Sequence, residues 1–189
     1  MQIKILQECG YEWAKLGTSL SRNQPKEKMV SVCAKLAHAG EGHSKFLEFI
    51  SVWIDILAPR YWWQQMATYR IGNSWLSQST MYTITKRELT FIDFTGNVSQ
   101  DILITINAFI QQYKKTDDPI IKDFWFNMIK CNLPEGFLQR RIMITNYKAL
   151  RNIILQRSNH KLSEWKYFCS EVLKQIEHPE FIIQSQLEI

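Results

Sequence analysis

The sequence lacks the short signatures by which many enzymes and metalloproteins are recognised. Its four cysteines, Cys9, Cys33, Cys131 and Cys169, are far apart and form no CxxC pair. This spacing predicts no metal site and fits free thiols in a reducing cytosol. The motifs GxGxxG, GxxxxGK[ST], HExxH and GxSxG are also missing, so the sequence indicates none of the nucleotide-binding or hydrolytic sites that these motifs form. Any catalytic chemistry must therefore come from a less local pattern.

Long apolar runs are absent as well. No segment approaches the ~20 residues that a membrane-spanning helix needs, and Lys4, Glu8 and Glu12 interrupt the start of the chain. The sequence therefore predicts neither a transmembrane helix nor a signal peptide. We expect a soluble cytoplasmic protein.

Basic residues exceed acidic ones without forming a basic tract. The net charge is +5 and the pI is near 9.0, yet no run of four or more lysines and arginines occurs. This balance favours anionic partners such as nucleotides. A basic helical nucleic-acid binder remains a minor alternative, which predicts salt-sensitive binding to duplex or single strands.

Hydrophobic and aromatic residues are plentiful. They make up 46% and 13% of the 189 residues, which is typical of a folded globular protein. We find no boundary between domains and expect a single domain over residues 1–189. Trp62, Trp63 and Trp75 could stack on a bound ring, but we expect them to pack in the core or between subunits.

Hydrophobic periodicity predicts that helices dominate, with a few strands between them. We expect a helix-rich α+β fold with a small, mostly antiparallel sheet. The predicted helices cover residues 11–23, 25–40, 59–71, 98–114, 119–131, 146–157 and 162–178, and the predicted strands cover residues 3–7, 50–58, 88–94 and 137–145. Alternating Ile50, Val52, Ile54 and Ile56 indicate a strand with one buried face. Residues 72–82 are polar with little periodicity, so we predict an ordered loop there.

One predicted helix carries a charge on its apolar face. From Asn146 onward this face presents Leu150, Ile153 and Ile154, and one turn later Arg157. A desolvated guanidinium is costly unless it is paired with an acceptor. Arg157 therefore either reaches water from the helix end or contacts a bound polar ligand.

Three segments, residues 40–82, 130–160 and 162–165, together resemble flavin-dependent thymidylate synthases, also called the thymidylate synthase complementing family. The matching residues are Gly42, His43, Pro59, Gln65, Arg70 and Ile71 in the first half, and Leu133, Pro134, Asn146, Leu150, Asn152 and Arg157 in the second half. His160 and Glu164 match if one residue is deleted after Arg157. The resemblance covers residues 28–178.

The sequence departs from the family pattern at several positions. The family signature Arg-His-Arg-x-x-Ser here reads Thr68-Tyr69-Arg70, and Ser79 takes the place of the Ser only if one residue is inserted. The Arg that follows in the family becomes Met81 or Thr80. Phe49 stands where the family has a His. The chain thus resembles a divergent member.

The resemblance implies that FAD is bound and that a one-carbon unit is moved from methylenetetrahydrofolate to C5 of deoxyuridine monophosphate (dUMP), with NADPH as the source of the hydride. The altered signature leaves room for another pyrimidine nucleotide or a hydroxymethylated product. The family's active sites lie between subunits, so we expect a homotetramer. The alternative is a catalytically degenerate nucleotide- and flavin-binding homologue with a non-enzymatic role.

The resemblance also implies a role for individual residues. Those expected to bind the nucleotide are Gln65, Arg70, Ser79, Lys130 and Arg157, with Arg157 as the catalytic residue beside the pyrimidine and Lys130 at the phosphate. Those expected to bind the flavin are Tyr69, Arg70, Ile71, Asn146, Lys148, Asn152 and His160. Two simpler interpretations stay open, because Asn146 is also a good helix N-cap and Lys130 also suits a helix C-terminus.

Overall fold

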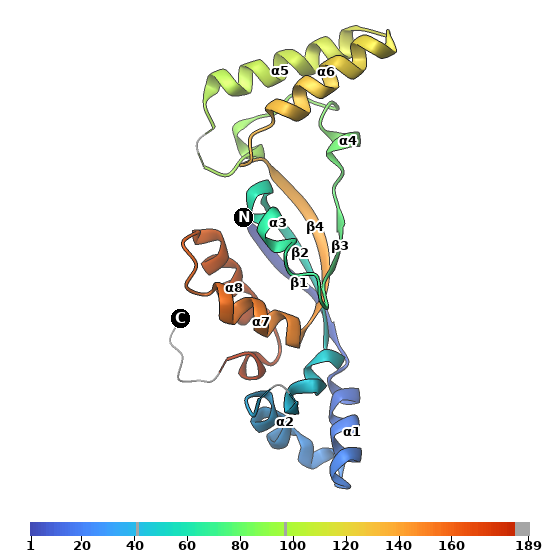
Figure 1. The fold of residues 1–189 in the computed structure, drawn as a ribbon, viewed down its shortest axis with the longest axis vertical. Helices are drawn as coiled ribbons and strands as arrows, with labels where there is room; N and C mark the ends of the chain where they lie inside the picture. The colour runs from blue at the N-terminus through green and yellow to red at the C-terminus, as the bar shows by residue number, and fades with distance from the viewer. Residues whose placement is uncertain (41, 97, 184–189) are drawn as a thin grey trace. The chain divides into compact units, whose positions relative to one another are not determined.

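The computed structural model describes residues 1–40, 42–96 and 98–183. It is helix-rich with one small antiparallel sheet (Figure 1), which confirms the predicted fold class. The chain divides into two compact units. The first unit contains Met1, Leu57–Gln65 and Ser77–Arg141, and the second contains Gln2–Ile56, Met66–Leu76 and Ile142–Ile189. The prediction of a single domain over residues 1–189 stays a prediction.

The sheet has four strands in the order β1-β2-β4-β3. Their bounds are Gln2–Cys9 for β1, Ser51–Pro59 for β2, Ser74–Ser77 for β3 and Leu138–Asn146 for β4. In β2, Val52, Ile54 and Ile56 are fully buried and alternate with half-buried residues. The predicted strand with one buried face is therefore confirmed.

The helices of the second unit bury apolar side chains. Its helices are α1 (Tyr11–Arg22), α2 (Met29–Ala37), α7 (Tyr147–Arg157) and α8 (Ser163–Gln175), with short 3₁₀ segments at Lys26–Lys28, His43–Phe49 and Pro179–Phe181. The apolar face of α7, formed by Leu150, Ile153 and Ile154, is fully buried as predicted. Trp165 and Phe168 of α8 are also fully buried.

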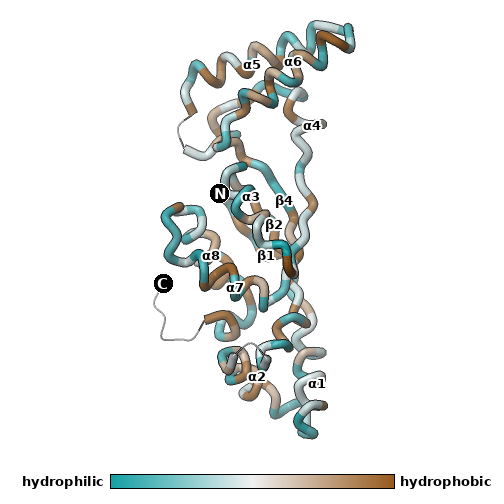
Figure 2. The backbone as a smooth tube through the Cα atoms, in the orientation of Figure 1, coloured by the Kyte–Doolittle hydropathy of each residue, from teal (hydrophilic) through white to brown (hydrophobic). Residues whose placement is uncertain are grey.

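The first unit contains a helical hairpin, α5 (Gln100–Lys115) and α6 (Pro119–Asn132), whose two helices lie side by side (Figure 1). Asp118 caps α6 by accepting hydrogen bonds from the Ile120 and Ile121 N–H groups, and Pro119 suits the first helical position. Both helices alternate polar and apolar residues along their length (Figure 2). Their inner faces join a cluster that includes Leu103, Ile106, Ile110 and Ile129.

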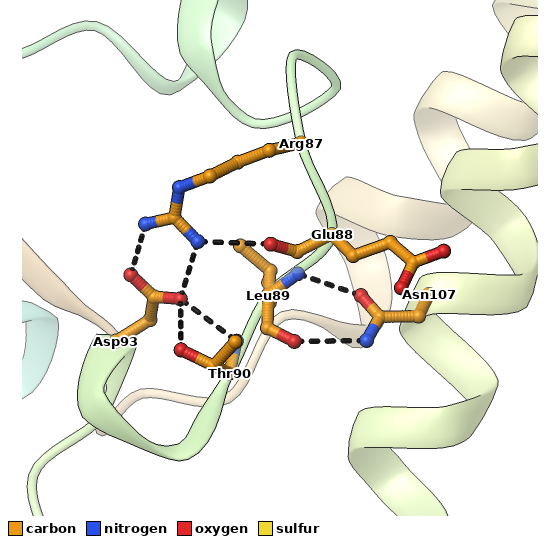
Figure 3. Close-up of polar contacts among 6 residues, drawn as sticks. All are labelled: Arg87, Glu88, Leu89, Thr90, Asp93 and Asn107. Carbon is orange, nitrogen blue, oxygen red and sulfur yellow. Dashed lines mark hydrogen bonds and ion pairs between the residues drawn. The ribbon is translucent and has the colours of Figure 1, made fainter.

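Two predictions for residues 72–94 are wrong. The expected loop over residues 72–82 contains β3 and α4 (Thr80–Thr83), because β3 pairs with β4 at the sheet edge and such pairing needs no hydrophobic period. The expected strand over residues 88–94 contains a 3₁₀ turn at Phe91–Asp93 (Figure 3). There the Asp93 carboxylate accepts hydrogen bonds from the backbone and hydroxyl of Thr90, and such local bonding competes with strand formation.

The helix expected over residues 59–71 is shorter than predicted. In the structure α3 covers Arg60–Met66, and the chain then turns, with the Tyr69 N–H donating to the Met66 carbonyl. Arg70 and Ile71 therefore lie in a turn. Within the described residues, every helix is too short or too polar to cross a lipid bilayer.

Candidate functional site

The start of α7 forms one side of a cleft in the second unit. β4 leads directly into α7, and the Asn146 side chain accepts a hydrogen bond of 2.9 Å from the Ala149 N–H. This confirms the N-cap interpretation of Asn146. The cap holds the first turn of α7 with its free N–H groups at the helix N-terminus, where the helix dipole favours negative charge.

The cleft has a volume of about 710 Å³, which lies within the usual range for small-molecule sites. Its lining residues are Gly40, Ser44, Glu48, Ile71, Gly72, Asn146, Lys148, Ala149, Arg151, Asn152 and Leu155. Four of the residues predicted to bind flavin are among them: Ile71, Asn146, Lys148 and Asn152. Lys148, Arg151, Asn152 and Leu155 recur at helical spacing, so they share one face of α7.

The charges of the cleft come from three side chains. The Lys148 ammonium lies 2.5 Å from a Glu48 carboxylate oxygen, so these two charges compensate each other. The Arg151 guanidinium instead donates through Nη1 to the Ala37 carbonyl, and its buried Nε has no acceptor in the described structure. Taken together, the three side chains leave one net positive charge in the cleft.

A tight turn closes the other side of the cleft. Gly72 has a φ of +73°, and a Cβ atom there would lie 3.0 Å from Asn146 Nδ2 and 3.2 Å from Ala149 Cβ. Glycine therefore lets the turn approach α7 closely. Asn73 holds this turn by donating to the Tyr69 and Ile71 carbonyls, while its own buried Oδ1 has no hydrogen-bond partner in the described structure.

Arg157 is half-buried and held by aromatic side chains. Its Nε donates a 2.7 Å hydrogen bond to the Tyr69 hydroxyl, and its guanidinium carbon lies 4.9 Å from the centre of the Trp165 ring. The Tyr69 hydroxyl in turn donates to Gln156 at 3.0 Å, and Gln156 donates to Asn152 at 2.8 Å. A chain of hydrogen bonds thus connects Asn152 in the cleft with Arg157.

The other three predicted flavin residues, Tyr69, Arg70 and His160, lie outside the lining of the cleft. Arg70 is exposed in the turn before Gly72. His160 is half-buried beyond the end of α7, where its Nδ1 accepts a hydrogen bond from the Leu162 N–H. The imidazole centre lies 6.3 Å from that of Trp165, which also contacts Arg157.

Three residues predicted to bind the nucleotide belong to the first unit. Lys130 of α6 donates a 2.5 Å hydrogen bond to the Thr80 hydroxyl. Burial lowers the pKa of the Lys130 ammonium, and the charge of Arg60 lowers it further. Ser79 is the N-cap of α4 but its side chain makes no capping hydrogen bond, and Gln65 is half-buried in the last turn of α3.

The predictions from sequence missed several residues of the cleft. Arg151 could have been found, since it lies on the same face of α7 as Lys148 and Asn152. Glu48 and Gly72 carried no local signal, because their roles depend on residues far away in the chain. Trp62 and Trp63 are fully buried in the first unit, as the packing interpretation expected.

Comparison with known proteins identifies relatives of this chain. A model of the thymidylate synthase complementing protein family matches residues 7–179. No curated protein sequence matches significantly. A crystal structure of the flavin-dependent thymidylate synthase ThyX from Helicobacter pylori, complexed with FAD and dUMP, is similar over 100% of both chains with a TM-score of 0.76 at 15% identity. A second structure of ThyX from Helicobacter pylori with FAD and dUMP matches over 100% of both chains with a TM-score of 0.77 at 14% identity. The predicted fold is therefore confirmed.

Proposed function

Because the chain belongs to the thymidylate synthase complementing protein family, we propose that it is a flavin-dependent thymidylate synthase. It would transfer a one-carbon unit from methylenetetrahydrofolate to C5 of dUMP, or of a closely related pyrimidine deoxynucleotide, with NADPH as reductant. The observation that carries this proposal is the cleft at the start of α7, where Ile71, Asn146, Lys148 and Asn152 lie together.

The chemistry of this cleft fits an FAD cofactor. It combines one net positive charge, a helix N-terminus and a buried polar atom, Arg151 Nε, that has no partner among the described residues. A buried polar atom without a partner costs about 1–3 kcal/mol, so a ligand that supplies a partner is favoured. Asn146, Lys148 and Asn152 would hold the cofactor. When bound, the reduced flavin supplies the hydride that reduces the transferred carbon.

Arg157 is the residue that we propose to act on the pyrimidine. Its Nε is engaged by Tyr69, and in the described structure no hydrogen bond involves its terminal amino groups. These planar donors suit a pyrimidine carbonyl. A fixed positive charge beside the negative charge that develops on the ring lowers the barrier, often by ~3 kcal/mol per donor.

The phosphate of the nucleotide would be bound by Lys130, with Ser79, Gln65 and Arg70 as further contacts. The lowered pKa of Lys130 reflects its burial and its proximity to another cation, Arg60. A dianionic phosphate would relieve both effects. Lys130 would act as a point charge, without the two parallel hydrogen bonds of an arginine.

The first experiment is a visible spectrum of the purified protein with FAD, before and after addition of dUMP. We expect flavin absorbance that shifts when the nucleotide binds, because both ligands would share one active site. A protein that gains no flavin absorbance on incubation with FAD would rule the proposal out.

Arg157→Ala tests the catalytic assignment. We expect dUMP-dependent reoxidation of the reduced flavin to fall at least about 100-fold, since the donors that stabilise the transition state are removed. The protein should stay folded, which circular dichroism checks. Arg22→Ala, an exposed arginine on α1, is the matched control and should retain activity. Normal turnover by Arg157→Ala would remove the role assigned to this residue.

A second candidate is a binding protein of this fold without turnover. Two observations favour it: Phe49, at the position of a family His, is 59% exposed, and Tyr69 already occupies the Nε donor of Arg157. The measurement that separates the two is NADPH oxidation that depends on both nucleotide and folate. Its absence from a protein that binds FAD and dUMP would favour the second candidate.

A further inference from the structure

Arg151 is the one cation of the α7 cleft, among the described residues, whose charge has no carboxylate partner. Lys148 is compensated by Glu48, whereas the only hydrogen bond recorded for Arg151 leads to the neutral carbonyl of Ala37. A half-buried guanidinium loses hydration, and that loss is offset only by acceptors or by an opposite charge. The described structure supplies one acceptor and no opposite charge.

Arg151 is fixed at both ends, by its backbone in α7 and by the hydrogen bond of its guanidinium. Its Cα belongs to the second turn of α7, and its Nη1 is anchored at Ala37, the last residue of α2. The carbonyl end of a helix attracts cations, so this contact holds the guanidinium at the wall of the cleft. Among the described residues, none accepts a hydrogen bond from the buried Nε. The arginine is thus anchored but not neutralised.

A second feature of the same cleft also attracts negative charge. The N-terminus of α7, with Asn146 and Ala149, lines the cleft together with Arg151. A helix N-terminus presents backbone N–H groups and a positive dipole end. The preceding turn carries one cation, Arg70, which is exposed and lies outside the lining of the cleft. Arg151 is therefore the source of the net charge.

We propose that Arg151 is an anion-binding residue that makes the cleft select a phosphate-bearing ligand, here the diphosphate of the flavin cofactor. An arginine presents parallel N–H donors that match phosphate oxygens. Riboflavin, which has the same ring system without phosphate, should gain nothing from Arg151. The cofactor assignment rests on the proposed function, while the anion-binding role of Arg151 can be tested without it.

The experiment is a set of equilibrium titrations, followed by fluorescence, with FAD, riboflavin and ADP. They are performed on the unmodified protein, on Arg151→Met and on Arg151→Lys. Arg22→Met is the matched control because it removes the same charge from α1, outside this cleft. We expect Arg151→Met to weaken FAD and ADP binding at least tenfold and riboflavin binding less than twofold. The FAD affinity of Arg151→Lys should lie between those of the unmodified protein and of Arg151→Met. The affinities of Arg22→Met should match those of the unmodified protein.

The possible outcomes separate two claims, the anion-binding role of Arg151 and the proposed function. Equal weakening of FAD and riboflavin by Arg151→Met would overturn the inference, because the residue would then only shape the cleft. Unchanged FAD affinity would overturn it and leave the proposed function standing. Binding of ADP that depends on Arg151, in a protein that binds no flavin, would uphold the inference and reject the proposed function. A protein that binds none of the three would overturn both.

The salt dependence of the unmodified protein gives a test that needs no variant. Screening weakens an interaction between an exposed ligand charge and a cation as ionic strength rises. We expect FAD affinity to fall between about 50 mM and about 500 mM salt while riboflavin affinity stays level. Parallel behaviour of the two ligands would contradict a charged contact, even if Arg151→Met fails to fold.

Discussion

Tyr69 determines how the guanidinium of Arg157 is held. Its hydroxyl accepts the hydrogen bond from Arg157 Nε and donates to Gln156, while its ring lies beside Trp165 and Arg157. A hydrogen bond to a charged group contributes about 1.5–3 kcal/mol. The hydroxyl is therefore strong enough to hold the guanidinium in one orientation, so Tyr69 acts as a positioning residue.

Tyr69→Phe removes the hydroxyl and keeps the ring. With saturating FAD and dUMP, we expect kcat to fall about tenfold, since the guanidinium becomes free to leave its position. The KM for dUMP should change less than kcat, because the charge is retained. Steady-state kinetics measures this split. Tyr82→Phe, on an exposed tyrosine of α4, serves as control, and an unaltered kcat for Tyr69→Phe would refute the positioning role.

At the scale of elements, the approach of the Gly72 turn to α7 forms the cleft. Gly72 and Gly96 share a positive φ, +73° and +69°, but only Gly72 has neighbours within 4 Å of an added Cβ. Alanine substitutions at these two glycines therefore separate the effect of backbone strain from the effect of crowding by the new Cβ atom. An alanine at position 96 would meet the backbone strain without the crowding.

Gly72→Ala should lower the free energy of unfolding by at least about 1–2 kcal/mol, the strain of a left-handed alanine. It should also weaken FAD binding, since Asn146 and Ala149 must move away from the new Cβ. Gly96→Ala should show the loss of stability without the loss of affinity. Denaturant unfolding and FAD titration measure the two effects. Equal FAD affinities for both variants would contradict the geometry of the cleft.

A second element, the 3₁₀ turn Phe91–Asp93, is held by an ion pair and local caps (Figure 3). Arg87 donates to both carboxylate oxygens of Asp93, and Asn107 of α5 makes two hydrogen bonds to the backbone of Leu89. The hydrogen bond from Arg87 is the main cause that lowers the pKa of the Asp93 carboxyl. Stability gained from a lowered carboxyl pKa is present above the unfolded value, 3.8, and is lost as the pH falls through the folded value.

Asp93→Asn should therefore lower the free energy of unfolding at about pH 7 by roughly 1 kcal/mol, because an exposed arginine contributes modestly. The difference from the unmodified protein should shrink as the pH falls below about 4 and through the lowered pKa of the folded carboxyl, because the carboxylate charge is then lost. Denaturant unfolding at a series of pH values measures it. Asp117→Asn, whose side chain is fully exposed, is the control. A difference that does not depend on pH would contradict the role of the carboxylate charge.

At the scale of the molecule, the candidate site residues divide between the two units. The flavin residues lie in the second unit, and Gln65, Ser79 and Lys130 lie in the first. Large apolar side chains are exposed in each unit, including Leu20 at 74% and Ile120 at 81%. The homotetramer implied by the family resemblance stays a prediction, and side chains of this kind would contribute to its interfaces if they form a contiguous apolar patch.

Sedimentation analysis tests this proposal. We expect a tetramer, and we expect Ile120→Glu on α6 to shift the protein toward smaller species, because burial of a charge at an apolar interface is costly. Gln112→Glu adds the same charge at an exposed polar position of α5 and should leave the assembly intact. A monomer at micromolar concentration would exclude the tetramer.

The sequence by itself determined the elements whose signals are local. The alternation of Val52, Ile54 and Ile56 predicts β2, and the pattern of Leu150, Ile153 and Ile154 after the Asn146 cap predicts α7, because periodicity and capping act within a few residues. The family resemblance likewise indicated four residues of the cleft, because a motif identifies residues by their type and spacing along the chain.

Only the tertiary structure decided how these elements form a site. Glu48 and Lys148 are 100 residues apart, and Arg151 and the carbonyl of Ala37 are 114 residues apart. No local pattern encodes such pairs, so two findings could not be predicted: the compensation of Lys148, and the lack of a carboxylate partner for Arg151 in the part of the chain that the structure describes. The early end of α3 and the turn at Phe91–Asp93 were missed for a related reason, since hydrogen bonds at Tyr69 and Asp93 outweigh the apparent period.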